Sequence, residues 1–436
     1  MGRGALLFGV ARVVDLRAMT VQEWFEAARF GLFFHWGHSS QRGHELSWPM
    51  VGGNFALPHC EDIPVAEYQS TSLTFNPERF DGREWARLAR EAGAEYAVFT
   101  AKHHDGYAMF HSQHSDFSVE HSPFGRDIVR EWVDAFRDEG LRVGLYFSLI
   151  DWHHPDYPAF TDEYRPYNFA RLPPPTPEQW ERYIEFMFRQ VRELLSNYGR
   201  IDLIWFDGQW EHTPQEWRAS ELAAMIRELQ PEIVINDRLP GGDYDTPEQF
   251  VPAQTPARPW EVCLTMNESW GYNPDDADYK SSRRLVQTLC EIAGKGGRLL
   301  LNLSPRGDGT LPPEQLERLG AVSGWMKRNG ESIIGTTPSL EPWQFCGPTT
   351  RRGDILYLHL LMRPYDAVTV RGVPIRRVKS VHELSSGTQL AFSVRCSVID
   401  QLLNADPVGE LTIDVPESVL DPLVMVLAVE IAPRGG

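Results

Sequence analysis

The stretch IDLIWFDGQW, residues 201–210, decides the fold class of this chain. An apolar run of this length that does not alternate with polar residues is typical of a strand in a parallel sheet covered on both faces. Asp207 ends the run and stands between the aromatic residues Phe206 and Trp210. Because barrels and open α/β sheets place their chemistry at the carboxyl ends of their strands, Asp207 is the first candidate for a functional carboxylate.

Strand-like and helix-like segments alternate around this stretch. The other strand candidates are residues 31–36, 96–102, 142–149, 233–235, 261–266 and 298–303, and the helix candidates are 83–92, 126–138, 177–198, 215–229, 282–293 and 313–328. Helix 177–198 is the clearest, because Thr176 can cap it, Pro177 suits its first position, Gln179 completes a capping box and Gly199 suits its end. Seven strands, with an eighth not located, predict a (β/α)₈-like TIM barrel rather than an open sheet, and no GxGxxG motif supports a dinucleotide fold.

The pattern changes near residue 339. Short strand-like runs at 355–362, 367–373, 377–384, 388–394, 410–415 and 424–431 are separated by Gly, Pro, Asn and Asp, without helical stripes. This pattern is typical of an all-β sandwich. We therefore expect an N-terminal extension that need not be ordered (1–20), a (β/α)₈-like catalytic domain (21–338) and a C-terminal β-sandwich domain (339–436).

Composition and charge exclude several partners and sites. The net charge of −18 repels nucleic acids and anionic membrane surfaces, so neither is expected as a partner. Assembly of the chain into a homo-oligomer remains a possible state. The five cysteines have no CxxC or zinc spacing, which indicates reduced thiols. The apolar run at residues 5–11 is too short to span a membrane and makes a poor signal peptide, so we expect a cytoplasmic protein.

Polar and aromatic side chains follow five of the predicted strands, and a barrel would gather them at one rim. They are His35, Trp36 and His38; His103, His104 and Asp105; Tyr146, Asp151 and Trp152; Trp205 and Asp207; and Asn236, Asp237 and Arg238. Neutral histidines, an arginine, aromatic rings and carboxylates together suit the hydroxyls and C–H faces of a sugar. Consecutive side chains of one strand point in different directions, and no HxH or HExxH spacing occurs, so we expect no metal at residues 103–105. The leading hypothesis is a glycosidase.

Seven motifs, in order along the chain, resemble those of the family 29 glycoside hydrolases, the α-L-fucosidases. They are FGLFFHWG (30–37), KHHDG (102–106), GLYFS (144–148), WFD (205–207), NDR (236–238), WGYN (270–273) and GGRLLLNLSP (296–305). The resemblance runs from about residue 24 to 336. It implies a barrel-like catalytic domain with a C-terminal β-sandwich, a fucosylated glycan or oligosaccharide as substrate, and no metal or organic cofactor.

The resemblance also implies roles for single residues. Asp207 corresponds to the catalytic nucleophile of the family, and Trp270 to the aromatic residue beside the methyl group of the sugar. Fucose-binding residues of the family correspond to His35, His103, His104, Tyr146, Trp205 and Arg238. Glu45 and Trp48 stand for an adjacent Glu-Trp pair that binds substrate in the family, although two residues separate them here.

The acid/base position differs among family members. Glu248, ten residues after Arg238, resembles the position used by many of them, and Glu261, Glu268 and Asp151 are its rivals. With Asp207 as nucleophile and Glu248 as acid/base, we expect release of L-fucose by double displacement with retention, with the two carboxyl groups about 5–5.5 Å apart. Two other hypotheses stay open: a fucose- or glycan-binding protein without catalysis, and a retaining glycosidase acting on a related sugar such as a galactoside.

Overall fold

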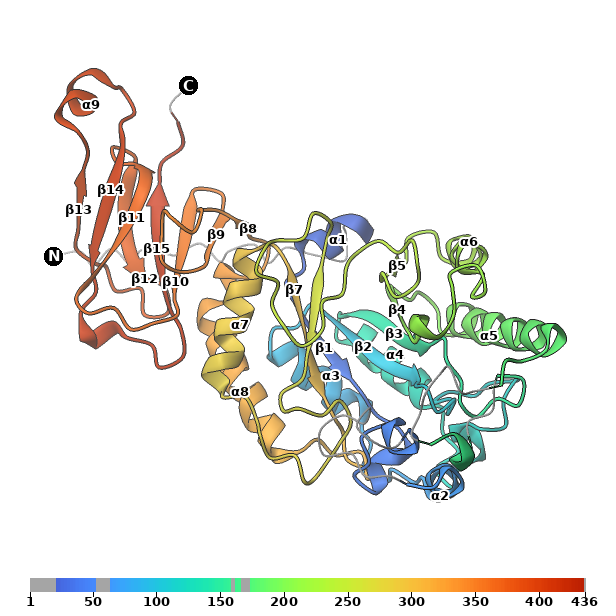
Figure 1. Ribbon diagram of the computed structural model, residues 1–436. Coiled ribbons are helices and arrows are strands. Elements are labelled where there is room, and N and C mark those ends of the chain that lie inside the picture. Colours follow the sequence, from blue (N-terminus) through green and yellow to red (C-terminus); the bar gives the residue numbers. More distant parts are fainter. Residues whose placement is uncertain (1–20, 52–62, 158–160, 166–172, 435–436) are drawn as a thin grey trace.

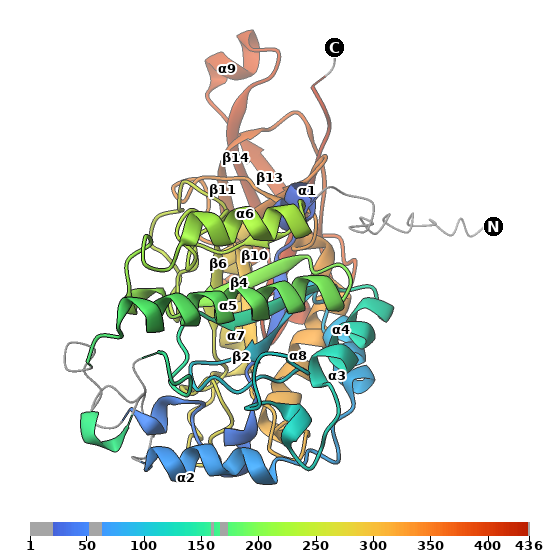
Figure 2. The ribbon, with the colours of Figure 1, turned by 90° about the vertical axis from the view of Figure 1, so that its right-hand side faces the viewer.

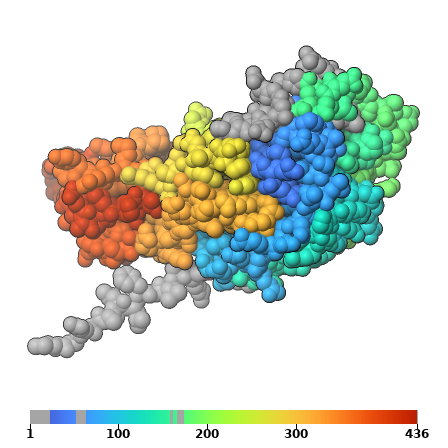
Figure 3. Space-filling view, turned by 90° about the horizontal axis from the view of Figure 1, so that it is seen from below, coloured from blue at the N-terminus to red at the C-terminus, as the bar shows by residue number. Residues whose placement is uncertain are grey.

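The computed structural model describes residues 21–51, 63–157, 161–165 and 173–434, and the expected extension 1–20 and Cys60 lie outside these ranges. Figure 1 shows a curled parallel sheet wrapped by helices, followed by antiparallel sheets that project to one side. In Figure 3 the orange and red surface of these last sheets lies at one end of an elongated molecule. None of the described helices is both long and apolar enough to cross a membrane.

Seven parallel strands form the catalytic sheet, in the order β5-β4-β3-β2-β1-β7-β6. Their bounds are β1 Phe30–Phe34, β2 Tyr96–Lys102, β3 Arg142–Ser148, β4 Leu203–Asp207, β5 Val234–Ile235, β6 Glu261–Leu264 and β7 Arg298–Leu303. All seven strands coincide with predicted strands. Each is buried along almost its whole length, which explains why their sequences do not alternate between polar and apolar residues.

Residues 243–249 occupy the eighth position, between β5 and β6. Tyr244 forms a parallel bridge with Asn236 after β5, and Glu248 forms one with Cys263 of β6. The segment follows β5 without a helix and contains Pro247, which has no N–H to donate to a ladder. This irregularity explains why the sequence did not reveal an eighth strand, and it places Glu248 beside β6.

Six helices cover the outer face of the sheet. They are α3 Gly82–Glu91, α4 Ile128–Asp138, α5 Pro177–Asn197, α6 Ala219–Leu229, α7 Ser282–Gly294 and α8 Pro313–Asn329, all close to their predicted bounds. Figure 2 shows α5 and α6 side by side over the sheet. The capping box between Thr176 and Gln179 is formed, and Gly199 has a φ of 70° after α5, as predicted. The short helices α1 Val21–Ala27 and α2 Val65–Ser70 were not predicted.

Side chains of the strands alternate between two cores. Leu32, Leu145 and Ile204 pack outward against the helices, whereas Phe33, Tyr146 and Trp205 belong to a separate inner cluster. Since successive residues of a strand point to opposite faces, Asp207 shares the inward face with Trp205, and Asn302 shares it with Leu300. The strands therefore direct polar side chains into the barrel at their carboxyl ends, which we call the rim.

The C-terminal part consists of two antiparallel sheets. The first contains β12 Val378–Glu383, β15 Met425–Ile431, β10 Ile355–Leu360, β9 Thr349–Arg352 and β8 Thr337–Pro338, in that order, and the second contains β11 Ala367–Pro374, β14 Val408–Asp414 and β13 Phe392–Arg395. Residues of both sheets, such as Leu358 and Leu411, share one core. The β-sandwich prediction is confirmed, but the expected absence of helices is wrong. Helix α9, Val398–Leu403, is only six residues long, too short to show a periodic apolar stripe.

Candidate active site

Asp207 lies at the end of β4 with its carboxylate at the rim. The Tyr146 hydroxyl donates to its Oδ2 at 2.9 Å, and Arg238 Nη1 donates to its Oδ1 at 3.0 Å. His104 Nε2 lies 3.8 Å from the same Oδ2. The side chain of Asp207 remains 15% exposed, so that it is anchored by charge and hydrogen bonds yet open to a small molecule.

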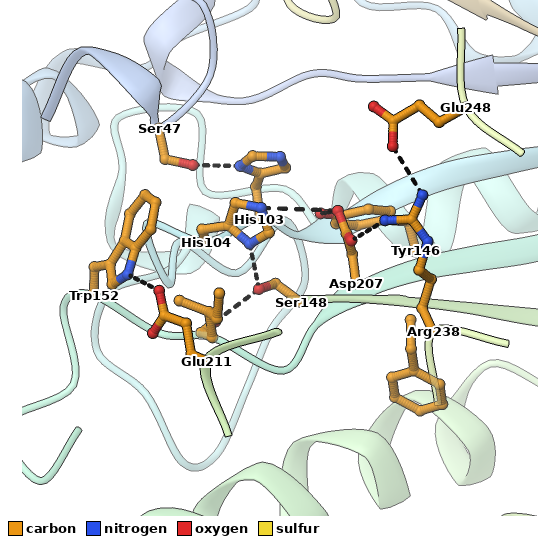
Figure 4. A network of polar contacts seen from close by, with 12 residues as sticks. Ser47, His103, His104, Tyr146, Ser148, Trp152, Asp207, Glu211, Arg238 and Glu248 are labelled. Carbon is orange, nitrogen blue, oxygen red and sulfur yellow. Dashed lines mark hydrogen bonds and ion pairs between the residues drawn. The ribbon is translucent and has the colours of Figure 1, made fainter. Parts of the chain in front are cut away.

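Arg238 joins Asp207 to Glu248. While Nη1 contacts Asp207, Nη2 donates to Glu248 Oε2 at 2.8 Å (Figure 4). The Nε atom of Arg238 donates to Thr246 Oγ1 at 3.1 Å. The Glu248 side chain is 40% exposed and therefore accessible to a leaving group. Both carboxylates thus share one fixed guanidinium, the arrangement in which two acidic groups can act on opposite sides of one bond.

A strained residue holds Glu248 in place. Gln249, a non-glycine residue, has a φ of 62°, a conformation that costs of order 1–3 kcal/mol. Its side chain donates to Thr265 Oγ1 at 3.0 Å and accepts from Thr265 N at 3.3 Å. These bonds offset the strain and fix the turn that presents Glu248.

Electrostatics distinguish the groups around Asp207. Burial raises the pKa of Asp207, and the Arg238 guanidinium and the Tyr146 hydroxyl oppose that rise by stabilising the carboxylate. Burial, the largest single effect, disfavours the charged form of Arg238, but the neighbouring groups, Asp207 first and Glu248 among them, together outweigh it and raise the pKa of Arg238. Burial, followed by the charge of Asp207, raises the pKa of Tyr146, so its hydroxyl stays a donor. Asp207 is thus stabilised as an anion by the cation of Arg238 and by two neutral donors, the Tyr146 hydroxyl and the backbone N–H of Gly208.

Three histidines line the same region, each with Nδ1 bound to a neighbouring side chain. His35 Nδ1 lies 2.7 Å from Asn302 Oδ1, His104 Nδ1 lies 2.7 Å from Ser148 Oγ, and His103 Nδ1 contacts Ser47 Oγ. Burial lowers the pKa of His35 and of His104 to about 3, and that of His103 well below its usual value. All three are therefore neutral at ordinary pH, as the hydroxyl-binding hypothesis requires.

Stacked rings form the wall beside Asp207. The Tyr146 ring lies between Trp205, at a centroid distance of 5.6 Å, and His103, at 5.5 Å, and both pairs are nearly parallel. The guanidinium of Arg238 lies 5.3 Å from the centroid of the Trp205 ring. This packing leaves Tyr146 few rotamers and directs its hydroxyl to Asp207.

Trp270, Glu45 and Trp48 enclose the site from loops. The Trp270 ring lies 5.0 Å from His35 between centroids, and the ring of Trp48 lies 5.4 Å from His104. Glu45 is buried, and its carboxylate accepts the backbone N–H groups of Trp270 at 2.5 Å and Gly271 at 2.7 Å. Burial raises the pKa of Glu45 to about 8 against the effect of these bonds. The structure thus brings Glu45 to the Trp270 loop rather than into the open part of the site.

The three rival carboxylates lie apart from Arg238. Glu261 is fully buried and accepts from Tyr96 OH at 2.5 Å, Trp205 Nε1 at 3.0 Å and Tyr244 OH at 3.4 Å. Asp151 forms a buried ion pair with Lys102 at 3.2 Å, and Glu268 pairs with Lys280 at 3.4 Å. Of the four candidates for the acid/base, Glu248 is the one that contacts Arg238, the cation that also contacts Asp207.

Sequence reasoning missed the residues that hold the histidines. Ser148 and Asn302 appear only inside longer motifs, and Ser47 lies between Glu45 and Trp48 without a role of its own. The position of Ser148 two residues after Tyr146 and the nearness of Ser47 to Trp48 were usable signals. Asp105, considered as a metal ligand, instead accepts from Tyr68 OH at 2.7 Å and lies 3.3 Å from His38 Nε2. Among the residues that the structure describes, no group of three or more His, Cys, Asp or Glu side chains is arranged to hold a metal ion.

Comparison with known proteins shows the family of this chain. The α-L-fucosidase family model matches residues 11–331. The bovine tissue α-L-fucosidase is 33% identical over 351 residues, which cover 74% of this chain and 71% of that protein.

Solved structures extend the match to the whole fold. α-L-fucosidase isoenzyme 1 from Paenibacillus thiaminolyticus superposes with a TM-score of 0.83 at 36% identity, covering 95% of this chain and 99% of its own. A family 29 α-L-fucosidase from Bacteroides thetaiotaomicron, solved as a covalent intermediate with 2-fluoro-fucosyl fluoride in a Glu-to-Gln mutant, has a TM-score of 0.79 at 25% identity, covering 94% and 96%. The chain belongs to the α-L-fucosidase family, glycoside hydrolase family 29.

Proposed function

We propose that this α-L-fucosidase hydrolyses terminal α-L-fucosides with Asp207 as the nucleophile and Glu248 as the acid/base. The observation that carries the assignment is the guanidinium of Arg238, which contacts Asp207 at 3.0 Å and Glu248 at 2.8 Å. A retaining glycosidase needs two carboxyl groups that flank one glycosidic bond. The trapped covalent intermediate of the Bacteroides relative supports the same two-step chemistry here.

The reaction follows from these two groups. Asp207 attacks the anomeric carbon and forms a glycosyl ester, while Glu248 gives its proton to the departing oxygen. Glu248, now ionised, then takes a proton from water, whose oxygen displaces Asp207 and releases L-fucose with its configuration retained. Arg238 keeps Asp207 charged before attack and contacts Glu248 whenever that residue is ionised.

The remaining rim residues bind the sugar in this proposal. His35, His103 and His104 offer uncharged ring nitrogens, Tyr146 and Trp205 form the stacked wall, and Trp270 supplies an apolar face. Trp48 packs beside His104, and Glu45 acts on the substrate through the Trp270 loop.

Turnover of 4-nitrophenyl α-L-fucoside by the wild type and by Asp207→Ala tests the proposal. We expect nitrophenol release by the wild type and almost none by the variant. A panel of aryl glycosides that includes the α-L-galactoside, which matches the hydroxyl layout of the α-L-fucoside, measures sugar selectivity. Fucose binding by a folded wild type without turnover of aryl fucosides or fucosylated oligosaccharides would contradict the proposed catalytic role.

Location and assembly form a further part of the proposal. The four described cysteines are free thiols, and the net charge is −18, which supports a reducing, cytoplasmic environment and no nucleic acid or anionic membrane partner. Cell fractionation tests the location. Light scattering of the purified protein distinguishes a monomer from a homo-oligomer.

A further inference from the structure

The partners of the site histidines determine where each imidazole carries its hydrogen. A neutral imidazole has one N–H and one lone pair, so the group bound at Nδ1 decides what Nε2 offers to a ligand. Both His35 and His104 are bound at Nδ1, to Asn302 and Ser148 respectively, each at 2.7 Å.

Asn302 fixes the hydrogen of His35. Its Nδ2 donates to the backbone carbonyl of Trp270 at 2.7 Å, and a carbonyl can only accept, so the amide nitrogen must face Trp270. The amide oxygen therefore faces His35, and since that oxygen can only accept, His35 Nδ1 is the donor. The Nε2 atom of His35 is left with a lone pair.

Ser148 fixes His104 by the same logic. Its hydroxyl donates to the carbonyl of Ile150 at 2.9 Å and has only one hydrogen, so Oγ must accept from His104 Nδ1. The Nε2 atom of His104 then carries no hydrogen, although it lies 3.8 Å from Asp207 Oδ2 (Figure 4). Within the described part of the chain this Nε2 has no hydrogen-bond partner. His104 therefore has no proton to donate to Asp207.

We propose that Asn302 and Ser148 are positioning residues that hold His35 and His104 as Nδ1–H tautomers. His35 then accepts a hydrogen bond from a substrate hydroxyl. His104 adds no further donor to the Asp207 carboxylate, which already accepts from Arg238, Tyr146 and the backbone N–H of Gly208, so that its basicity is preserved for attack. The tautomers follow from the hydrogen bonds, whereas the roles of the two histidines rest on the proposed function of Asp207. Ser47 is not included, because its hydroxyl can either donate to His103 or accept from it.

The tautomers are measured directly by two-bond ¹H–¹⁵N correlation spectra of the full chain labelled with ¹⁵N-histidine. Cross-peaks are assigned by their loss in His35→Gln and His104→Gln. We expect a pyrrole-type Nδ1 and a pyridine-type Nε2 for both residues between pH 5 and 8. A pyrrole-type Nε2, or averaged tautomers, for either residue overturns the proposal for that residue. This readout does not require turnover, so an inactive wild type would count against the proposed function alone.

Kinetics of Ser148→Ala test the role of His104. Without Ser148 Oγ the ring can move its hydrogen to Nε2 and donate to Asp207, which lowers the pKa of Asp207. We expect the acid limb of kcat/KM to move to lower pH. Ser332→Ala is the matched control, because Ser332 Oγ likewise donates to a carbonyl, that of Asn329, and lies 3.1 Å from a buried histidine, His359. An unmoved acid limb in a folded Ser148→Ala protein overturns the role.

Asn302→Leu tests the role of His35. We expect kcat/KM to fall about tenfold, mainly through KM, because one well-placed hydrogen bond to the sugar is weakened. Asn329→Leu is the control, since the Asn329 amide also donates to a tryptophan carbonyl, that of Trp325, but contacts no histidine of the site. An unchanged KM in Asn302→Leu contradicts the proposal, and the spectra of the wild type remain decisive if the variant does not fold.

Discussion

Asp207 and Glu261 lie on the inner side of the same barrel but at opposite ends of its strands. Asp207 ends β4 at the rim, whereas Glu261 begins β6 at the amino ends, which we call the floor. Trp205 connects the two regions, because its ring stacks on Tyr146 beside Asp207 while its Nε1 donates to Glu261.

Their partners make the two carboxyls chemically different. Burial raises the pKa of both, that of Glu261 to about 7. Asp207 is in direct contact with the cation Arg238 and is 15% exposed, while Glu261 accepts hydrogen bonds from the neutral groups of Tyr96, Trp205 and Tyr244 and is fully buried. Whether a buried carboxyl of this barrel can react therefore depends on which end of its strand it occupies, more than on whether it belongs to Asp or Glu.

The largest effect should come from removing the rim carboxylate. We expect Asp207→Ala to lower kcat/KM for 4-nitrophenyl α-L-fucoside by about 10⁴-fold or more, because the carboxylate that attacks the anomeric carbon in the proposed mechanism is removed. Initial rates measured from well below KM up to saturating substrate give the loss. A variant with more than a tenth of wild-type activity would place the nucleophile elsewhere.

Removal of the second rim carboxyl should depend on the leaving group. We expect Glu248→Gln to lower kcat/KM, which reports the first step alone, about 10²- to 10³-fold for an alkyl fucoside, but far less for 2,4-dinitrophenyl fucoside, whose leaving oxygen needs little protonation. Glu268→Gln, which alters another partly exposed glutamate paired with a cation, should leave both substrates unaffected. Equal losses on the two substrates would remove Glu248 from the acid role.

Loss of the shared cation should shift a pH profile. Arg238 opposes the pKa rise that burial causes at Asp207, so Arg238→Met should raise that pKa further. The acid limb of kcat/KM should then move to higher pH, with activity at the optimum reduced about tenfold to hundredfold. A limb that moves to lower pH would contradict the electrostatic role assigned to Arg238.

Substitution of Glu261 at the floor should change the stability of the protein rather than its turnover. Glu261 has a pKa raised above its value in the unfolded chain, so the folded state holds its proton more tightly. Its contribution to the free energy of unfolding is therefore complete at low pH and is lost as pH rises through about 7. Glu261→Gln should keep kcat within about threefold and show a smaller fall of Tm between pH 5 and 8 than the wild type. A large loss of kcat with an unchanged Tm profile would assign Glu261 to the reaction.

Much of the fold and of the site could be predicted because both depend on local sequence signals. Buried parallel strands such as 201–207 appear as apolar runs, and the capping box of Thr176 and Gln179 predicts the start of α5. Among the features that escaped prediction, three are instructive. Residues 243–249 complete the barrel through isolated bridges around Pro247, helix α9 is a single short piece, and the contacts of Asn302 depend on the spacing between strands. Each is set by tertiary pairing, which no single window of sequence contains.

Covalent labelling tests most directly whether the carboxylate of Asp207 forms a bond to the sugar. Glu248→Gln protein, whose second step should be slow, is treated with 2-deoxy-2-fluoro-α-L-fucosyl fluoride, digested, and examined by mass spectrometry. The account predicts one fluorofucosyl group per chain, on the peptide that contains Asp207, and none in protein that also carries Asp207→Ala. A label on the peptide of Glu261, Glu268 or Asp151 would contradict it.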